Sequence, residues 1–230
     1  LRVNLLTTAG FIPLTAAIVL SILSSSILVL IPASIVGGII AGPFIAGMFD
    51  SIMRGLRDAP GKLMEHYKKS WQNNWRQSLI PGALTGLMGG LVSFMVYMIW
   101  ISNVFPGWLT IVLLLFSISL FLMISTLYWP QLVLFHQSNG IRIKNTVLFV
   151  LSHFWRVLGT VLLELFYLLF YIFFAPWTLI LIPFLGFWLI IYLSQFFLYN
   201  QLNEDLRIED QYRAVEGDPW RVSLLDQTPV

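Results

Sequence analysis

The chain has 230 residues, of which 58% are hydrophobic and only 10% are charged, with a formal net charge of +2. A soluble globular domain carries about a quarter charged residues, so this composition excludes an ordinary soluble protein. The absence of cysteine excludes disulfides and thiolate metal sites. The modest net charge follows from membrane topology and does not indicate a nucleic-acid partner.

A run without any charged residue or histidine extends from Val3 to Phe49. As a single helix, at about 1.5 Å per residue, it would be roughly twice as long as the ~30 Å core of a bilayer requires. The run therefore folds back and crosses the membrane twice. The predicted spans are residues 11–31, 33–50, 79–102, 108–133, 157–175 and 177–199. The fold class is thus an all-α, polytopic transmembrane helical bundle, with one domain in residues 1–202 and an acidic cytoplasmic tail in residues 203–230.

The predicted spans form three antiparallel hairpins, because short, uncharged turns that contain proline join them in pairs. These turns lie at Pro32, at residues 103–107 and at Ala175-Pro176. The segment 33–50 has an alternative structure, a re-entrant or broken helix, because it contains Gly42-Pro43 and a second glycine pair.

All 13 basic residues fall on one side of the membrane if the chain crosses it six times. They are Arg2, Arg54, Arg57, Lys62, Lys68, Lys69, Arg76, Arg142, Lys144, Arg156, Arg207, Arg213 and Arg221. Loops rich in Lys and Arg stay in the cytoplasm. Both termini are therefore predicted to be cytoplasmic, and the three short turns face outward.

The segment 62–79 leads into the third span and has an amphipathic pattern. Apolar and aromatic residues recur every four positions from Leu63 to Leu79, and the basic residues lie off this stripe. Such a pattern predicts a cytoplasmic helix in the interfacial plane that is attracted to anionic lipid. The predicted lipid contacts are Tyr67, Trp71, Trp75, Lys68, Lys69 and Arg76. The alternative is a cytoplasmic helix packed against the protein's own loops.

Glu164 is the only ionisable carboxyl or base deep inside a predicted span. A charge at the bilayer centre costs about 2.5–3.5 kcal/mol on insertion scales, and such residues usually face the bundle interior and mark function. We therefore predict a solute or proton site at Glu164 and Tyr167. In the structural alternative, a protonated carboxyl is hydrogen bonded to Tyr167, to a serine or to a carbonyl group on a neighbouring helix.

Glycines at four-residue spacing form small faces on the second and third spans. Small faces allow helix backbones to approach closely in lipid. The predicted packing residues are Gly38, Gly42, Gly82, Gly86 and Gly90. They serve either packing within this chain or the seam of a homo-oligomer.

Motifs of known catalytic sites do not occur in the chain. The zinc-protease, nucleophile-elbow and phosphate-loop patterns are missing, and no carboxylate pair lies within the predicted spans. His66, His136 and His153 lack the spacing of metal ligands. The sequence therefore predicts a protein that is not an enzyme and has no metal or cofactor. An intramembrane enzyme is a weaker alternative, for which no residue set is evident.

Several stretches together resemble one known family. They are AGPFIAGMFD at 41–50 with Arg57-Asp58 after it, YKKSWQNNWRQ at 67–77, and the last hairpin with residues 145–156, 186–192 and 198–200. These stretches resemble the YesL-like family of bacterial integral membrane proteins, whose activity is not established. The resemblance implies a bacterial plasma-membrane protein linked with carbohydrate ABC transport and its regulation. It implies no catalytic residues.

Two functions are predicted from these features. The first is a non-enzymatic accessory or regulatory partner of a transport system, whose contacts are the lipid bilayer and transporter subunits or a second copy of itself. The second is a small-solute permease or a membrane-embedded substrate-capture subunit that uses Glu164.

Overall fold

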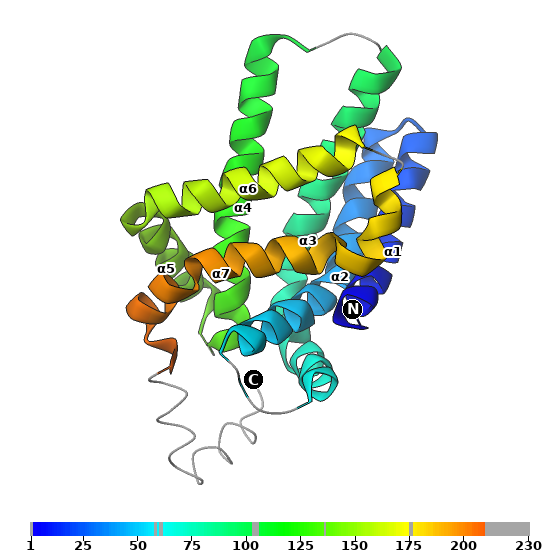
Figure 1. Ribbon diagram of the computed structural model, residues 1–230. Helices are drawn as coiled ribbons and strands as arrows, with labels where there is room; N and C mark the ends of the chain where they lie inside the picture. The colour runs from blue at the N-terminus through cyan, green and yellow to red at the C-terminus, as the bar shows by residue number, and fades with distance from the viewer. Residues whose placement is uncertain are drawn as a thin grey trace.

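A computed structural model describes residues 2–57, 59, 62–102, 106–135, 137–174 and 177–209, and within these ranges the chain is helical and has no strand (Figure 1). The α-helices of the described residues are α1 (Arg2–Leu23), α2 (Ile27–Leu56), α3 (Leu63–Ser102), α4 (Trp108–Leu134), α5 (Asn139–Ser152), α6 (Phe154–Phe173) and α7 (Phe187–Leu206). A 3-10 helix, Trp177–Leu181, and a π-helix, Ile182–Gly186, precede α7.

Six helical segments of the described residues are long and apolar enough to cross a membrane. They are Arg2–Leu23, Ile27–Leu56, Leu63–Ser102, Trp108–Leu134, Phe154–Phe173 and Ile182–Leu206. Most of each apolar stretch is not buried inside the chain, as expected for side chains that contact lipid. The predicted class, an all-α multi-pass membrane protein, is confirmed. Residues 103–105, 175–176 and 210–230, which include parts of two predicted turns and most of the predicted tail, lie outside the described residues.

The first predicted turn is wrong in position. The chain reverses at Ser24–Ser26, where Ser25 has φ 51°, and Pro32 lies inside α2. Near the start of a helix a proline removes one backbone hydrogen bond, and neighbouring groups in a membrane bundle compensate for such a loss. The Ser24 hydroxyl donates to the Ser21 carbonyl oxygen at 2.9 Å and thereby supports the actual turn. Since the whole run is uncharged, hydropathy did not locate the reversal.

The second span is a continuous helix, so the re-entrant alternative for 33–50 is wrong. α2 extends through Gly42 and Pro43 without interruption. Its second half packs on three neighbours in one cluster, where Met48 and Ile52 contact Val3 of α1 and residues of α3 and α7. Beside Pro43 the helix packs closely on α3, where Gly42 lies against the backbone of Ser78 and Gly82, so protein rather than lipid covers this part of the helix.

The predicted interfacial helix and the third span are one helix, α3, and the assignment of Tyr67 to the lipid surface is wrong. The Tyr67 side chain is 4% exposed, and its hydroxyl donates to the Phe44 carbonyl oxygen at 3.4 Å. A spacing of four residues exceeds the 3.6-residue turn, so each step rotates the stripe by about 40° around the helix. Trp71 and Trp75 consequently reach the surface, where Lys68, Lys69 and Arg76 also lie, while Tyr67 faces α2.

The α2–α3 contact is the most extensive between helices in the described chain. All five predicted packing glycines, Gly38, Gly42, Gly82, Gly86 and Gly90, lie in it. A Cβ atom at Gly38 would collide with the Gly82 carbonyl oxygen, and one at Gly86 would collide with the Ser34 carbonyl oxygen. Backbone thus rests on backbone, which only glycine permits. The structure places these residues in packing within the chain rather than on an outer face.

The last hairpin, α6 and α7, is inclined to the bundle of α1–α4 (Figure 1). α6 and α1 have similar lengths. If the α6–α7 hairpin began beside the first turn of α1 and ran parallel to α1, the tip of the hairpin, between α6 and α7, would lie beside the last turn of α1. Instead, Asn4 in the first turn of α1 is hydrogen bonded to Ile182 and Pro183 at the tip. Phe11 stacks on Phe187, with ring centroids 4.5 Å apart. The inclined hairpin thus crosses the bundle, and a space remains between them.

Candidate functional site

A cavity of about 470 Å³ lies between the α1–α4 bundle and the inclined hairpin. Its walls are mainly aromatic and aliphatic, including Phe11, Phe49, Phe121, Trp129 and Phe187. Its polar lining residues include Thr85, Ser125, Thr126, Glu164, Tyr167 and Gln195. A concave, mostly apolar site with a few convergent polar groups is typical of small-molecule binding, and 300–1,000 Å³ is roughly the usual size.

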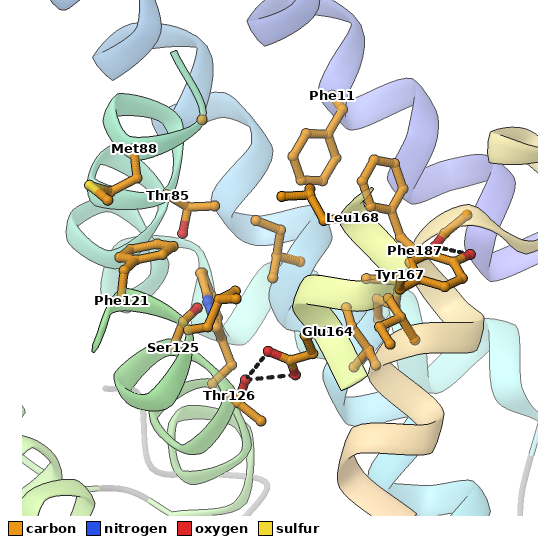
Figure 2. A pocket seen from close by; sticks show the side chains of 18 of the residues that line it. Phe11, Thr85, Met88, Phe121, Ser125, Thr126, Glu164, Tyr167, Leu168 and Phe187 are labelled. Atoms are coloured by element: carbon orange, nitrogen blue, oxygen red, sulfur yellow. Dashed lines mark hydrogen bonds between the residues drawn. The ribbon is translucent and has the colours of Figure 1, made fainter. Parts of the chain in front are cut away.

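The Glu164 carboxyl group points from α6 toward α4 at the edge of this cavity (Figure 2). The Thr126 hydroxyl lies 2.9 Å from one carboxyl oxygen and 3.0 Å from the other, and it donates to this carboxyl. Thr126 is itself fixed, because Gln195 Nε2 of α7 donates to its carbonyl oxygen at 2.9 Å. Ser194 of α7 faces the same carboxyl, and among the described residues the Gln195 carboxamide oxygen is buried without a hydrogen-bond partner.

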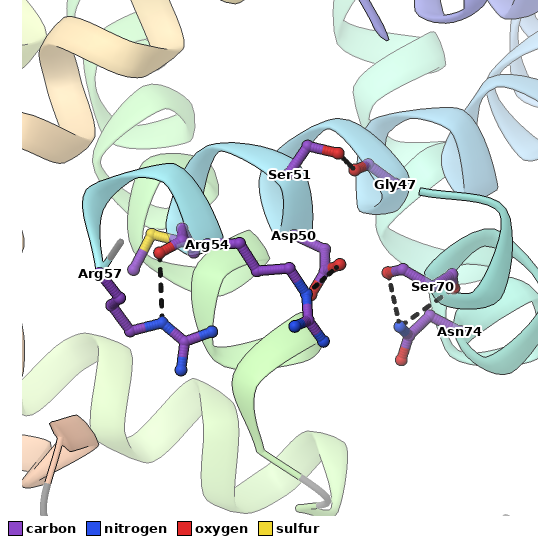
Figure 3. Close-up of polar contacts among 8 residues, drawn as sticks. Gly47, Asp50, Ser51, Arg54, Arg57, Ser70 and Asn74 are labelled. Carbon is purple, nitrogen blue, oxygen red and sulfur yellow. Dashed lines mark hydrogen bonds and ion pairs between the residues drawn. The ribbon is translucent and has the colours of Figure 1, made fainter. Parts of the chain in front are cut away.

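A carboxyl on α2 is handled differently from Glu164, which is partly buried. Asp50, which is 5% exposed near the end of α2, forms an ion pair with Arg54 one turn later at 3.1 Å (Figure 3). The ion pairs of the described residues do not include Glu164. A buried charge is normally paired, since the isolated ion is strongly destabilised. Asp50 satisfies this rule within the chain, whereas Glu164 faces a cavity instead of a cation.

Tyr167 lines the cavity but does not contact Glu164 through a hydrogen bond. Its hydroxyl lies 3.1 Å from the Tyr171 hydroxyl and donates to the Gly186 carbonyl oxygen at 3.0 Å. The structural alternative in which Tyr167 binds the Glu164 carboxyl is therefore wrong, and Thr126 has that place. Tyr167 instead supports the irregular backbone before α7.

The irregular backbone between α6 and α7 forms one wall of the cavity through Ile182, Gly186 and Phe187. Non-helical backbone at membrane depth requires partners from the protein. Asn4, fully buried, provides them: its Nδ2 donates to the carbonyl oxygens of residues 182 and 183 at 2.8 and 2.7 Å. Its Oδ1 accepts from the backbone N–H groups of residues 187 and 188 at 3.2 and 3.0 Å. The one sequence signal for this role is an amide side chain within an otherwise apolar stretch.

Arg142 is a second residue that the sequence reading missed. From the sequence it was placed only among the basic residues on the cytoplasmic side, and the structure shows that it is fully buried on α5. Its guanidinium group donates to Asn139 Oδ1 at 3.0 Å, to the Phe135 carbonyl oxygen at 3.4 Å and to Gln77 Oε1 of α3, and it lies over the Tyr128 ring. These contacts hold α5 against α3 and α4.

We expect Arg142→Ala to loosen α5 and to lower the free energy of unfolding by about 2 kcal/mol, because hydrogen bonds to charged groups contribute about 1.5–3 kcal/mol. Hydrogen exchange of α5 amides, measured by mass spectrometry in nanodiscs, should become faster. Lys144→Ala is the matched control, since Lys144 is exposed on the same helix. Equal exchange in both variants would contradict the role of Arg142.

No protein-family model, curated protein or solved structure matches this chain. The YesL-like resemblance therefore stays a prediction, and function is argued from the site. Among the described residues, no group of three His, Asp or Glu side chains is arranged to hold a metal ion. What the site offers is a mostly apolar cavity with one acid at its edge that forms no ion pair among the described residues.

Proposed function

We propose that this chain is a multi-pass plasma-membrane protein that binds one amphipathic small molecule in the cavity beside Glu164. The observation that carries the proposal is the convergence of an apolar cavity and a partly buried carboxyl that forms no ion pair among the described residues. Of the two functions predicted from the sequence, this is the second, substrate capture. The geometry favours it because Glu164 faces a cavity of ligand size rather than a dry helix contact.

The proposed activity is binding without chemical conversion of the ligand. The proposed orientation has both termini in the cytoplasm, supported by the one-sided distribution of basic residues. A binding subunit of this kind would pass its ligand to, or sense it for, a transport system. An accessory role in bacterial carbohydrate transport, which the family resemblance implies, is compatible with that and stays a prediction. Recovery of transporter subunits with the protein in mild detergent tests it, and recovery of the isolated chain alone would count against it.

Filling the cavity is expected to abolish ligand binding without unfolding the protein. Gly89 lines the cavity, and no heavy atom lies within 4 Å of a Cβ atom built there. We expect Gly89→Leu to weaken saturable binding of the neutral apolar fluorophore N-phenyl-1-naphthylamine at least about tenfold, which is ~1.4 kcal/mol. The measurement is fluorescence in nanodiscs, with the signal of empty nanodiscs subtracted.

Gly159→Leu is the control for this experiment. Gly159 also has open space at its Cβ position, but it lies on an exposed part of α6 and does not line the cavity. The control should bind the fluorophore as the wild type does. Equal binding by wild type and Gly89→Leu, or no saturable binding by the wild type, would refute the proposed function.

A further inference from the structure

The charge of the proposed ligand follows from what surrounds Glu164. The cavity-lining side chains of α1, α2, α3, α4 and α7 carry no charge, and on α6 the other titratable lining groups are the phenols of Tyr167 and Tyr171. The Glu164 carboxyl is partly buried and accepts a hydrogen bond from Thr126, but no positive charge faces it among the described residues. In mainly apolar surroundings an ionised carboxylate is strongly destabilised, which favours uptake of a proton or a cation. Since the described chain provides no cation, Glu164 is neutralised by a proton or by a ligand.

The aromatic walls favour a cation over an anion. Phe11, Phe121 and Phe187 surround the cavity together with Tyr167 (Figure 2). The face of an aromatic ring carries partial negative charge and attracts organic cations, which are only weakly hydrated. Small inorganic ions need a shell of several oxygen ligands. A cavity whose walls are mainly carbon suits an organic cation better than an inorganic one.

We propose that the cavity binds hydrophobic organic cations, and that each bound cation displaces the proton that Glu164 holds when the cavity is empty. This inference rests on the proposed function, since it assigns a ligand class to the same cavity. In the exchange, the O–H bond of the Glu164 carboxyl breaks and the proton leaves to water. The electron pair stays on the carboxylate, which faces the cation. One positive charge enters the site and one leaves, so the site is neutral in both states.

Tetraphenylphosphonium tests the inference, because tetraphenylborate has nearly the same size and shape and the opposite charge. The purified wild-type protein should bind the phosphonium saturably, with a dissociation constant at least about tenfold lower than for the borate. A pH dye in weakly buffered solution should report about one proton released for each cation bound, since the site stays neutral. Binding should weaken as the pH falls, because proton and cation compete for one carboxyl group.

Glu164→Gln keeps the shape of the side chain and removes the exchangeable charge. It should still bind N-phenyl-1-naphthylamine, but it should lose phosphonium binding and proton release. Glu65→Gln is the control, because Glu65 is exposed on α3 and pairs with Lys62 away from the cavity. If Glu164→Gln does not fold, the proton release and pH dependence of the wild type still decide the question.

The outcomes separate this inference from the proposed function. Neutral-ligand binding together with equal affinity for phosphonium and borate, or without proton release, would overturn cation exchange and leave the proposed function standing. Phosphonium binding that is unchanged in Glu164→Gln would also overturn it. If the wild type binds neither the fluorophore nor the phosphonium, the proposed function fails first.

Discussion

Replacing Asn4 with leucine is expected to lower the free energy of unfolding by about 3–5 kcal/mol, since each buried polar group left without a partner costs about 1–3 kcal/mol. The change removes four hydrogen bonds to the backbone at residues 182–188. Water is scarce at membrane depth, so it does not replace them readily. Thermal unfolding in nanodiscs, followed by tryptophan fluorescence, measures the loss.

Two matched variants make the Asn4 result specific. Asn4→Asp keeps the acceptor oxygens for the N–H groups of Phe187 and Trp188, but it loses the donor to the carbonyl groups of Ile182 and Pro183. It should fall between wild type and Asn4→Leu. Thr15→Val removes only a hydroxyl on an exposed part of α1 and should change little. If Asn4→Leu is as stable as Thr15→Val, with unchanged hydrogen exchange at residues 182–188, Asn4 does not hold the hairpin.

The second large effect is expected at the α2–α3 contact. Gly86→Val should destabilise the protein by about 3 kcal/mol, at the upper end of the usual cost of overpacking, because the added atoms meet backbone rather than a side chain that can move. The nearest atoms are the carbonyl oxygen of Ser34 and the backbone of Gly38. Gly86→Ala should show a smaller loss in the same direction. The measurement is the thermal midpoint in detergent and in nanodiscs.

Gly89 provides a control for which the expected change in stability has the opposite sign. It is on the same helix, but no heavy atom lies within 4 Å of its Cβ position. Alanine is a better helix former than glycine by up to about 1 kcal/mol, so Gly89→Ala should be neutral or stabilising. If Gly86→Ala and Gly89→Ala behave alike, the α2–α3 contact is looser than the structure shows.

Hydropathy predicted the membrane class and several helices, because the free-energy cost of placing a charged side chain in lipid depends on that residue alone and not on its tertiary contacts. The predicted span 108–133 differs from α4 by one residue, because the apolar stretch begins directly after the predicted turn and has the same length as the helix. The same property failed within 3–49, where no charged residue interrupts the run and only three consecutive serines mark the reversal at Ser24–Ser26. Periodicity failed at Tyr67, because a four-residue stripe rotates around the helix.

The sequence alone determined that this protein is a helical membrane protein with one unpaired acid deep in a span, because desolvation of charge is a local property. It also singled out the glycine faces of the second and third spans. Only the structure showed that these two faces pack against each other. Tertiary structure decided what Glu164 faces, because the inclination of α6–α7 creates the cavity. That inclination depends on Asn4 and the backbone near Ile182, which lie 178 residues apart in the sequence. Contacts between such distant residues leave no local pattern, so the site emerged only when the chain was folded.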